Sequence, residues 1–381
     1  MFGFKNVNAY IYKQGIVKVD IAIENGKIVK IGNNLDIDEV IKVKDNQVVL
    51  PGFIDQHIHG AGSFDAMDKN ASNVLGIAEN LLKEGTTCFL ATTMTQSKEN
   101  IINSLQAINS AIKSQKTGAK ILGVHLEGPF ISKKYIGAQP LEFVKEFDIE
   151  FFDELQSKSQ NIIKMVTLAP EEKGGAEFVK GLTKRGVISS VAHSDAGYND
   201  IEKAYQNGLS CVSHTFNAQR PIHHREIGVA GTGLLLDGIY TEIICDLIHL
   251  SIPAIKLVLK CKQKDKIILI TDSMRAKGLD DGISELGGQK VIVKNGEARL
   301  ENGALAGSTL KMNVAIKNLV ENCDVKLEDA VDFATINPAT HLKIEKDYGS
   351  IEVGKNASFC VLNPDFSVAK TIVDGKELYK A

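Results

Sequence analysis

Short apolar runs recur through the middle of the chain, and segments of helical pattern separate them. The runs occupy residues 53–59, 87–93, 121–127, 162–168, 187–193, 210–215, 240–246 and 267–272. Strands that are apolar throughout and alternate with helices are typical of a parallel sheet buried on both faces. Because a closed barrel contains eight such units, we predict an α/β fold with a (β/α)8 TIM-type barrel over residues 51–342.

The helical segments between the runs have recognisable ends. Residues 73–84 have helical periodicity and stop at Gly85, a residue type that commonly ends helices.

An open, doubly wound sheet is the competing arrangement of the same alternation. No G-x-G-x-x-G motif follows the first run, which disfavours the open sheet.

Strand patterns return at both ends of the chain. Residues 16–31 alternate between apolar and polar positions and turn at Asn25-Gly26, while a second hairpin is predicted at Asp374-Gly375. Neither end alone is large enough to form a stable sheet. We therefore expect both termini to pair in one small β-sandwich domain, comprising residues 1–50 and 343–381.

A third region of strand pattern lies between about residues 283 and 306, with a turn at Asn295-Gly296. It follows the eighth apolar run, so we predict an inserted hairpin at that point. Helices are expected next, over residues 310–322 and 327–335.

Composition narrows the setting in which the protein works. The net charge of −3 offers no basic excess that would attract nucleic acid or a membrane surface. No run reaches the roughly 20 apolar residues of a membrane helix, and the first residues lack a secretory signal pattern. The six cysteines are scattered without a C-x-x-C pair, which favours a reducing compartment. We expect a cytoplasmic protein.

Potential metal ligands stand at the ends of five of the eight runs. They are His57 and His59, Glu127, His193, His214 and Asp272. The carboxyl ends of barrel strands meet at one rim, and side chains two positions apart share a face of a strand. A single histidine at a strand end is usually structural, but imidazoles and carboxylates that converge from five strands require a cation. Nitrogen and oxygen donors without thiolate suit zinc, iron or manganese.

Five segments resemble the amidohydrolase superfamily: PGFIDQHIHG, GVHLEGPF, AHSDA, SHTFNA and TDSM. The motifs HLEGPF and SHTFNA, with the later LAGS, are similar to the N-acetylglucosamine-6-phosphate deacetylase family. This resemblance covers essentially the whole chain, including the divided β-domain. HLEGPF is highly specific, whereas H-x-H and TD are shared by many relatives.

The resemblance implies a divalent metal site with two ions per subunit. Glu127, His193 and His214 would hold the principal metal, and His57 and His59 a second one. Asp272 would be the catalytic acid and base. Many relatives bridge their metals with a modified lysine on strand four, but residues 167–170 contain no lysine, so Glu127 is the expected bridge.

The resemblance also implies a phosphorylated amino-sugar substrate and a homodimer. The residues expected to bind substrate are Gly137, Ala138, Gln139, Asn217, Ala218, Arg225, His249, Leu305, Ala306, Gly307 and Ser308. Asn217 and Ala218 would contact the phosphate, and Arg225 would reach the active site of the neighbouring subunit. From the residues alone, a solvated loop charge is the favoured interpretation of Arg225. Relatives often have histidine at position 139, and glutamine can donate a hydrogen bond there but cannot carry charge.

The expected reaction is hydrolysis of N-acetyl-D-glucosamine 6-phosphate to D-glucosamine 6-phosphate and acetate, in amino-sugar catabolism or recycling. The same reaction on N-acetylgalactosamine 6-phosphate is an alternative, because the two sugars differ only at the C4 hydroxyl. Deamination of a nucleobase is a further alternative, although few aromatic residues lie near the motifs. An inactive binding protein is also conceivable, but such relatives usually lose metal ligands, and here the set is complete.

Overall fold

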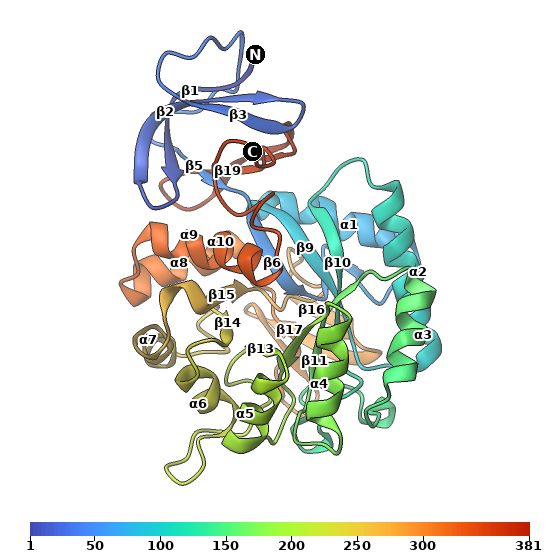
Figure 1. Cartoon of the computed structure of the whole chain (residues 1–381). Helices are drawn as coiled ribbons and strands as arrows, with labels where there is room; N and C mark the ends of the chain where they lie inside the picture. Colours follow the sequence, from blue (N-terminus) through green and yellow to red (C-terminus); the bar gives the residue numbers. More distant parts are fainter.

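The eight apolar runs form one parallel sheet in the computed structural model, which describes residues 1–381. In sheet order the strands are β6 (Phe53–Ile58), β9 (Thr86–Thr93), β10 (Lys120–Glu127), β11 (Ile163–Leu168), β12 (Ile188–Val191), β13 (Leu209–Val212), β14 (Tyr240–Ile244) and β15 (Ile267–Ile270). The last strand returns to the first, because the Asp272 amide donates to the His57 carbonyl at 2.9 Å. The predicted barrel is confirmed (Figure 1).

Helices alternate with these strands and cover the outside of the barrel (Figure 1). They are α1 (Ala71–Leu81), α2 (Lys98–Ser114), α3 (Ile149–Ser159), α4 (Gly175–Lys184), α5 (Tyr198–Gln206), α6 (Gly228–Leu235), α7 (Ile252–Cys261), α8 (Met312–Cys323), α9 (Leu327–Ala334) and α10 (Ile336–His341). Short 3-10 turns occur at η1 (Leu82–Glu84), η2 (Lys133–Tyr135), η3 (Leu141–Phe143) and η4 (Lys264–Lys266). The first helix and η1 end at Gly85, whose φ of 82° is the left-handed conformation that favours glycine. No helix is long and apolar enough to cross a membrane.

The barrel strands are buried on both faces, as their apolar sequences predict. Every residue of β6 and β9 is buried. On the outer side, Ile77 and Leu81 of α1 join the same apolar cluster as Phe89 of β9. Burial of one such side chain contributes about 1.5–3 kcal/mol, so this layer fixes the strand positions that carry the site.

Both termini form a separate β-domain beside the barrel, as predicted (Figure 1). Its sheet has the order β3 (Lys27–Gly32), β2 (Gly15–Glu24), β1 (Phe2–Ile11), β5 (Val48–Pro51), β19 (Phe359–Leu362), β20 (Val368–Val373) and β21 (Lys376–Lys380), with β4 (Glu39–Val40) beside β1. Antiparallel pairing of β5 with β19 joins the two ends of the chain. Phe4 and Phe359 lie edge to face at 5.1 Å in the shared core. The exact boundaries near residues 50 and 343 remain a prediction.

The predicted insertion after the eighth strand is a three-stranded antiparallel sheet. It consists of β16 (Gly282–Leu286), β17 (Gln289–Lys294) and β18 (Glu297–Leu300). Val291 and Ala298 pack in one cluster with Met94 and Met274, which follow β9 and β15. The insertion therefore lies against the carboxyl ends of the barrel strands. The small hairpin of β7 (Gly60–Ala61) and β8 (Phe64–Asp65) follows the first barrel strand.

Candidate active site

Three of the predicted site residues lie just beyond their strands in a left-handed backbone conformation. The φ angles are 47° for His193, 31° for His214 and 48° for Asp272. Non-glycine residues rarely adopt this conformation, and such strain is concentrated at functional sites. The predicted strands were therefore too long at their carboxyl ends, since β12, β13 and β15 stop before these residues.

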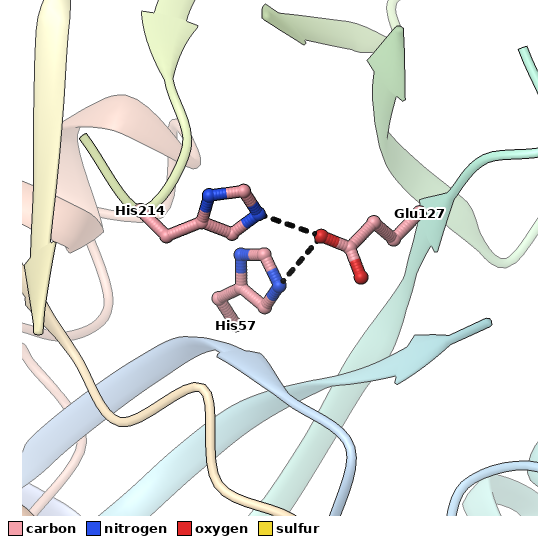
Figure 2. A group of neighbouring side chains, drawn as sticks. All are labelled: His57, Glu127 and His214. Atoms are coloured by element: carbon pink, nitrogen blue, oxygen red, sulfur yellow. Dashed lines mark hydrogen bonds and ion pairs between the residues drawn. The ribbon is translucent and has the colours of Figure 1, made fainter. Parts of the chain in front are cut away.

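Glu127 is the centre on which the predicted histidines converge, and Figure 2 shows two of them, His57 and His214. Its Oε1 atom lies 2.9 Å from His214 Nε2, 3.3 Å from His57 Nε2 and 3.4 Å from His193 Nε2. The other oxygen, Oε2, lies 3.2 Å from His59 Nε2. The structure thus brings together all four histidines around one buried carboxylate.

Asp272 closes this cluster from the last barrel strand. Its Oδ1 atom lies 3.2 Å from His59 Nε2 and 3.6 Å from His57 Nε2. The side chain also lines the cavity above the cluster. It can therefore reach both the metal-ligand group and a bound substrate.

The second ring nitrogen of each histidine is held by a hydrogen-bond acceptor. His59 Nδ1 lies 3.1 Å from the Thr92 carbonyl, and His193 Nδ1 lies 3.1 Å from the Tyr135 carbonyl. The Nδ1 atoms of His214 and His57 meet the Asn217 carbonyl at 3.2 Å and Glu242 Oε2 at 3.1 Å. Because these oxygens only accept, each Nδ1 carries a hydrogen and each Nε2 is left as a potential metal ligand.

The donor set fits a divalent metal. Two overlapping groups, His57–Glu127–His214 and His57–His59–Asp272, each have ligand atoms within 4.8 Å of one another. The buried Nε2 atom of His57 has no hydrogen-bond partner. Nitrogen lone pairs that face carboxylate oxygens at about 3 Å repel them unless a cation lies between. Nitrogen and oxygen donors without thiolate suit zinc, iron or manganese.

The pKa values of His59 and Asp272 also show that this cluster stabilises positive charge. Burial by itself lowers the pKa of His59, yet Asp272 and Glu127 raise it to about 10. Burial by itself raises the pKa of Asp272, yet the charge of His57 and the contact with His59 lower it to about 2. Protons and metal ions therefore compete for the same ligands.

A cavity of about 380 Å³ opens above the cluster. Of the residues predicted to bind substrate, those that line it are Gly137, Ala138, Gln139, Asn217, Ala218, His249, Leu305 and Gly307. His249 is oriented by Asp246, whose Oδ2 lies 2.7 Å from its Nδ1. Gln139 donates from Nε2 to Glu127 Oε2 at 2.7 Å and accepts from the Thr95 amide at 2.7 Å. In this chain, position 139 thus contacts a metal-ligand candidate.

Three of the predicted residues lie outside the cavity lining. Ala306 is buried behind it, and the Ser308 amide donates to the Asp272 carbonyl at 2.8 Å, which helps to hold the Asp272 loop. Arg225 is exposed on the loop between β13 and α6, where its Nη1 lies 2.7 Å from His224 Nε2. A role for Arg225 in a neighbouring subunit stays a prediction.

Sequence reasoning missed several residues around the site, and two of them carry charge at the cavity or the metal-ligand cluster. Arg299, on β18 of the insertion, lines the cavity. Glu242, within β14, is buried against His57. A charged residue inside an otherwise apolar strand was the available indication for Glu242. His125, two positions before Glu127 on β10, lies 2.7 Å from Thr167 Oγ1 through Nε2, and burial lowers its pKa to about 3.

Comparison with known proteins agrees with this geometry. The sequence model of the amidohydrolase family matches residues 48–378 of this chain. The chain is 42% identical over 361 residues to the N-acetylglucosamine-6-phosphate deacetylase of Bacillus subtilis (strain 168), covering 93% of this chain and 91% of that protein. It is 34% identical over 334 residues to the N-acetylgalactosamine-6-phosphate deacetylase of Escherichia coli O157:H7, covering 87% and 88%. The crystal structure of N-acetylglucosamine-6-phosphate deacetylase from Thermotoga maritima superimposes with a TM-score of 0.90 at 36% identity, covering 100% of both chains.

Proposed function

The chain belongs to the amidohydrolase family, and from that premise we propose that it hydrolyses N-acetyl-D-glucosamine 6-phosphate to D-glucosamine 6-phosphate and acetate. The convergence of four histidines, Glu127 and Asp272 beneath a substrate-sized cavity carries this proposal. The N-acetylglucosamine-6-phosphate deacetylase of Bacillus subtilis is more identical to this chain, over a larger share of both proteins, than the N-acetylgalactosamine-6-phosphate deacetylase of Escherichia coli. The galactosamine alternative is therefore not favoured.

We assign two divalent ions, of zinc, iron or manganese, to this site. Glu127, His193 and His214 would hold the first, and His57 and His59 would hold the second. Glu127 contacts both groups through its two oxygens, which supports a bridging role. When bound, such ions polarise the substrate carbonyl and lower the pKa of a water molecule from 15.7 to about 7.

Asp272 moves the proton during the reaction. Its carboxylate accepts a proton from the water whose oxygen forms the new bond to the acetyl carbon. It then donates that proton to the sugar nitrogen as the C–N bond breaks, which gives acetic acid and a neutral amine. The remaining acid proton passes to the amine or to solvent, which leaves acetate. The Asp272 carboxyl lies in the cavity beside His59, where both transfers are within reach.

The remaining residues bind and orient the sugar. Asn217 and Ala218, which follow β13, are suited to the phosphate, and His249 to a sugar hydroxyl. Gln139 donates to Glu127 with its side-chain nitrogen and accepts from the Thr95 amide with its oxygen. Its role is therefore to orient Glu127. Arg225, exposed on its loop, would complete the phosphate site of a second copy, so we propose a homodimer. The free thiols of this chain support a cytoplasmic location.

The direct test is acetate release by the metal-supplied protein. We expect hydrolysis of N-acetylglucosamine 6-phosphate, much slower reaction of the galactosamine isomer, and still slower reaction of unphosphorylated N-acetylglucosamine. A metal-replete protein that releases no acetate from either phosphorylated sugar would contradict the proposal and favour a deaminase or a binding protein. Preference for the galactosamine isomer would correct the substrate alone.

A further inference from the structure

Glu242 is a fully buried carboxylate in the middle of β14, at 0% exposure. Its Oε2 atom lies 3.1 Å from His57 Nδ1, and its Oε1 atom accepts from Gln56 Nε2 at 2.6 Å. Both partners belong to β6, which only β15 separates from β14 around the barrel. Glu242 is thus placed behind one specific metal-ligand candidate.

A chain of hydrogen bonds fixes the direction of every proton around Glu242. The oxygen of the Gln56 amide lies 3.0 Å from His341 Nδ1, and Ser210 Oγ lies 3.3 Å from His341 Nε2. A carboxylate only accepts, so Gln56 donates to it with its nitrogen and accepts from His341 with its oxygen. His57 must then carry its hydrogen on Nδ1, which leaves Nε2 free to bind a metal.

The charge of Glu242 requires compensation. A buried carboxylate is costly unless it is paired and hydrogen-bonded, and no lysine or arginine contacts this one. The nearest place for positive charge is therefore His57 or an ion bound to it.

His57 differs in this respect from the other histidines of the cluster. His59, His193 and His214 present Nδ1 to neutral backbone carbonyls, whereas His57 presents it to a carboxylate. A hydrogen bond to an ionised acceptor is roughly twice as strong as one between neutral groups, and it makes the imidazole a better electron donor.

We propose that Glu242 is a positioning residue that fixes the tautomer and orientation of His57 and so sets the metal affinity of the His57–His59 position. It acts there and not on the Glu127–His193–His214 position. This inference rests on the proposed two-metal site. It adds a buried carboxylate that governs occupancy of one position selectively.

The test is metal binding, measured with Zn²⁺ in a competing chelator buffer and by elemental analysis of the dialysed protein. In Glu242→Gln the second ion should bind about 10–100-fold more weakly, while the first ion binds as in the wild type. In a His57→Ala/His59→Ala background, Glu242→Gln should have no further effect. Asp332→Asn, which alters a half-buried carboxylate outside the cluster, serves as the control and should keep both ions.

Two results would overturn the role of Glu242. One is wild-type affinity for both ions in Glu242→Gln while His57→Ala/His59→Ala loses one. The other is equal weakening of both positions. If the wild type binds one ion and the double variant leaves it unchanged, the two-metal site fails and Glu242 loses its role with it. If Glu242→Gln does not fold, Glu242→Asp retains the charge but falls short of His57, and it should show the same selective loss to a smaller degree.

Discussion

Replacement of Asp272 by asparagine tests the proposed chemistry most directly. Asparagine has nearly the same shape, so the backbone hydrogen bonds of residue 272 to His57 and Ser308 should persist. The contact with His59 can also be kept, because an amide oxygen can occupy the position of Oδ1. The amide can neither accept the proton of the attacking water nor return it to the leaving nitrogen.

The expected loss follows from that single change. General acid–base catalysis contributes typically about 10²–10⁴-fold, equivalent to roughly 3–5 kcal/mol of barrier. In the proposed mechanism Asp272 is both the base and the acid, so its replacement removes both functions at once. We therefore expect turnover to fall by at least about 10²-fold, with little change in substrate affinity.

The assay is acetate release from saturating N-acetylglucosamine 6-phosphate, with the metal content of each preparation measured in parallel. The Asp332→Asn variant removes a partly buried carboxyl elsewhere in the barrel, next to Tyr10, and should retain full activity. A metal-replete Asp272→Asn enzyme within about tenfold of the wild type would refute the acid–base role, since that loss is too small for it.

Three further predictions concern the metals, the phosphate and the pH dependence of stability. Replacing both His57 and His59 by alanine should lower the bound metal from about two ions to about one per chain, because Glu127, His193 and His214 remain. Elemental analysis measures this content, and an unchanged value would contradict the second site. Arg225→Ala should slow hydrolysis of the phosphorylated sugar far more than that of the free sugar, and equal slowing would argue against phosphate contact. Burial raises the pKa of Asp332 from its ordinary 3.8 to about 6 in the folded chain. Between about pH 4 and 6 the folded state therefore holds a proton that the unfolded chain has lost. The free energy of unfolding accordingly falls as the pH rises through that window. Asp332→Asn should remove this component, which urea unfolding would detect as a larger gain in stability at pH 7 than at pH 4.5.

The barrel was predictable because its strands are apolar throughout and its turns carry local sequence features. The eight runs begin within one residue of the observed strands. Their ends were less predictable, since His193, His214 and Asp272 leave the strand by adopting positive φ. A left-handed glycine is visible in a sequence, whereas a left-handed histidine or aspartate is held by surrounding structure and has no local signature.

The candidate ligands were predictable for a related reason. Parallel strands bring all their carboxyl ends to one rim, so His57, Glu127 and Asp272 could be grouped without knowing any distance. Glu242 could not be grouped in this way, because it lies inside β14 and not at its carboxyl end, and it meets His57 within the barrel. Arg299 depends on how the inserted sheet lies over the rim, which only tertiary packing determines.

The net charge of the site relates the ligands at the barrel rim to Glu242 inside the barrel. Glu127, Asp272 and Glu242 are buried carboxylates, while Gln139, which contacts Glu127, is neutral. One divalent ion would leave this group with net negative charge, which would oppose binding of a phosphorylated substrate. Two ions exceed the three carboxylates by one positive charge and so favour an anion in the cavity. On this argument Glu242 is compatible with the reaction when a metal ion fills the proposed His57–His59 position, and a chain without that histidine pair would have no use for a carboxylate at position 242.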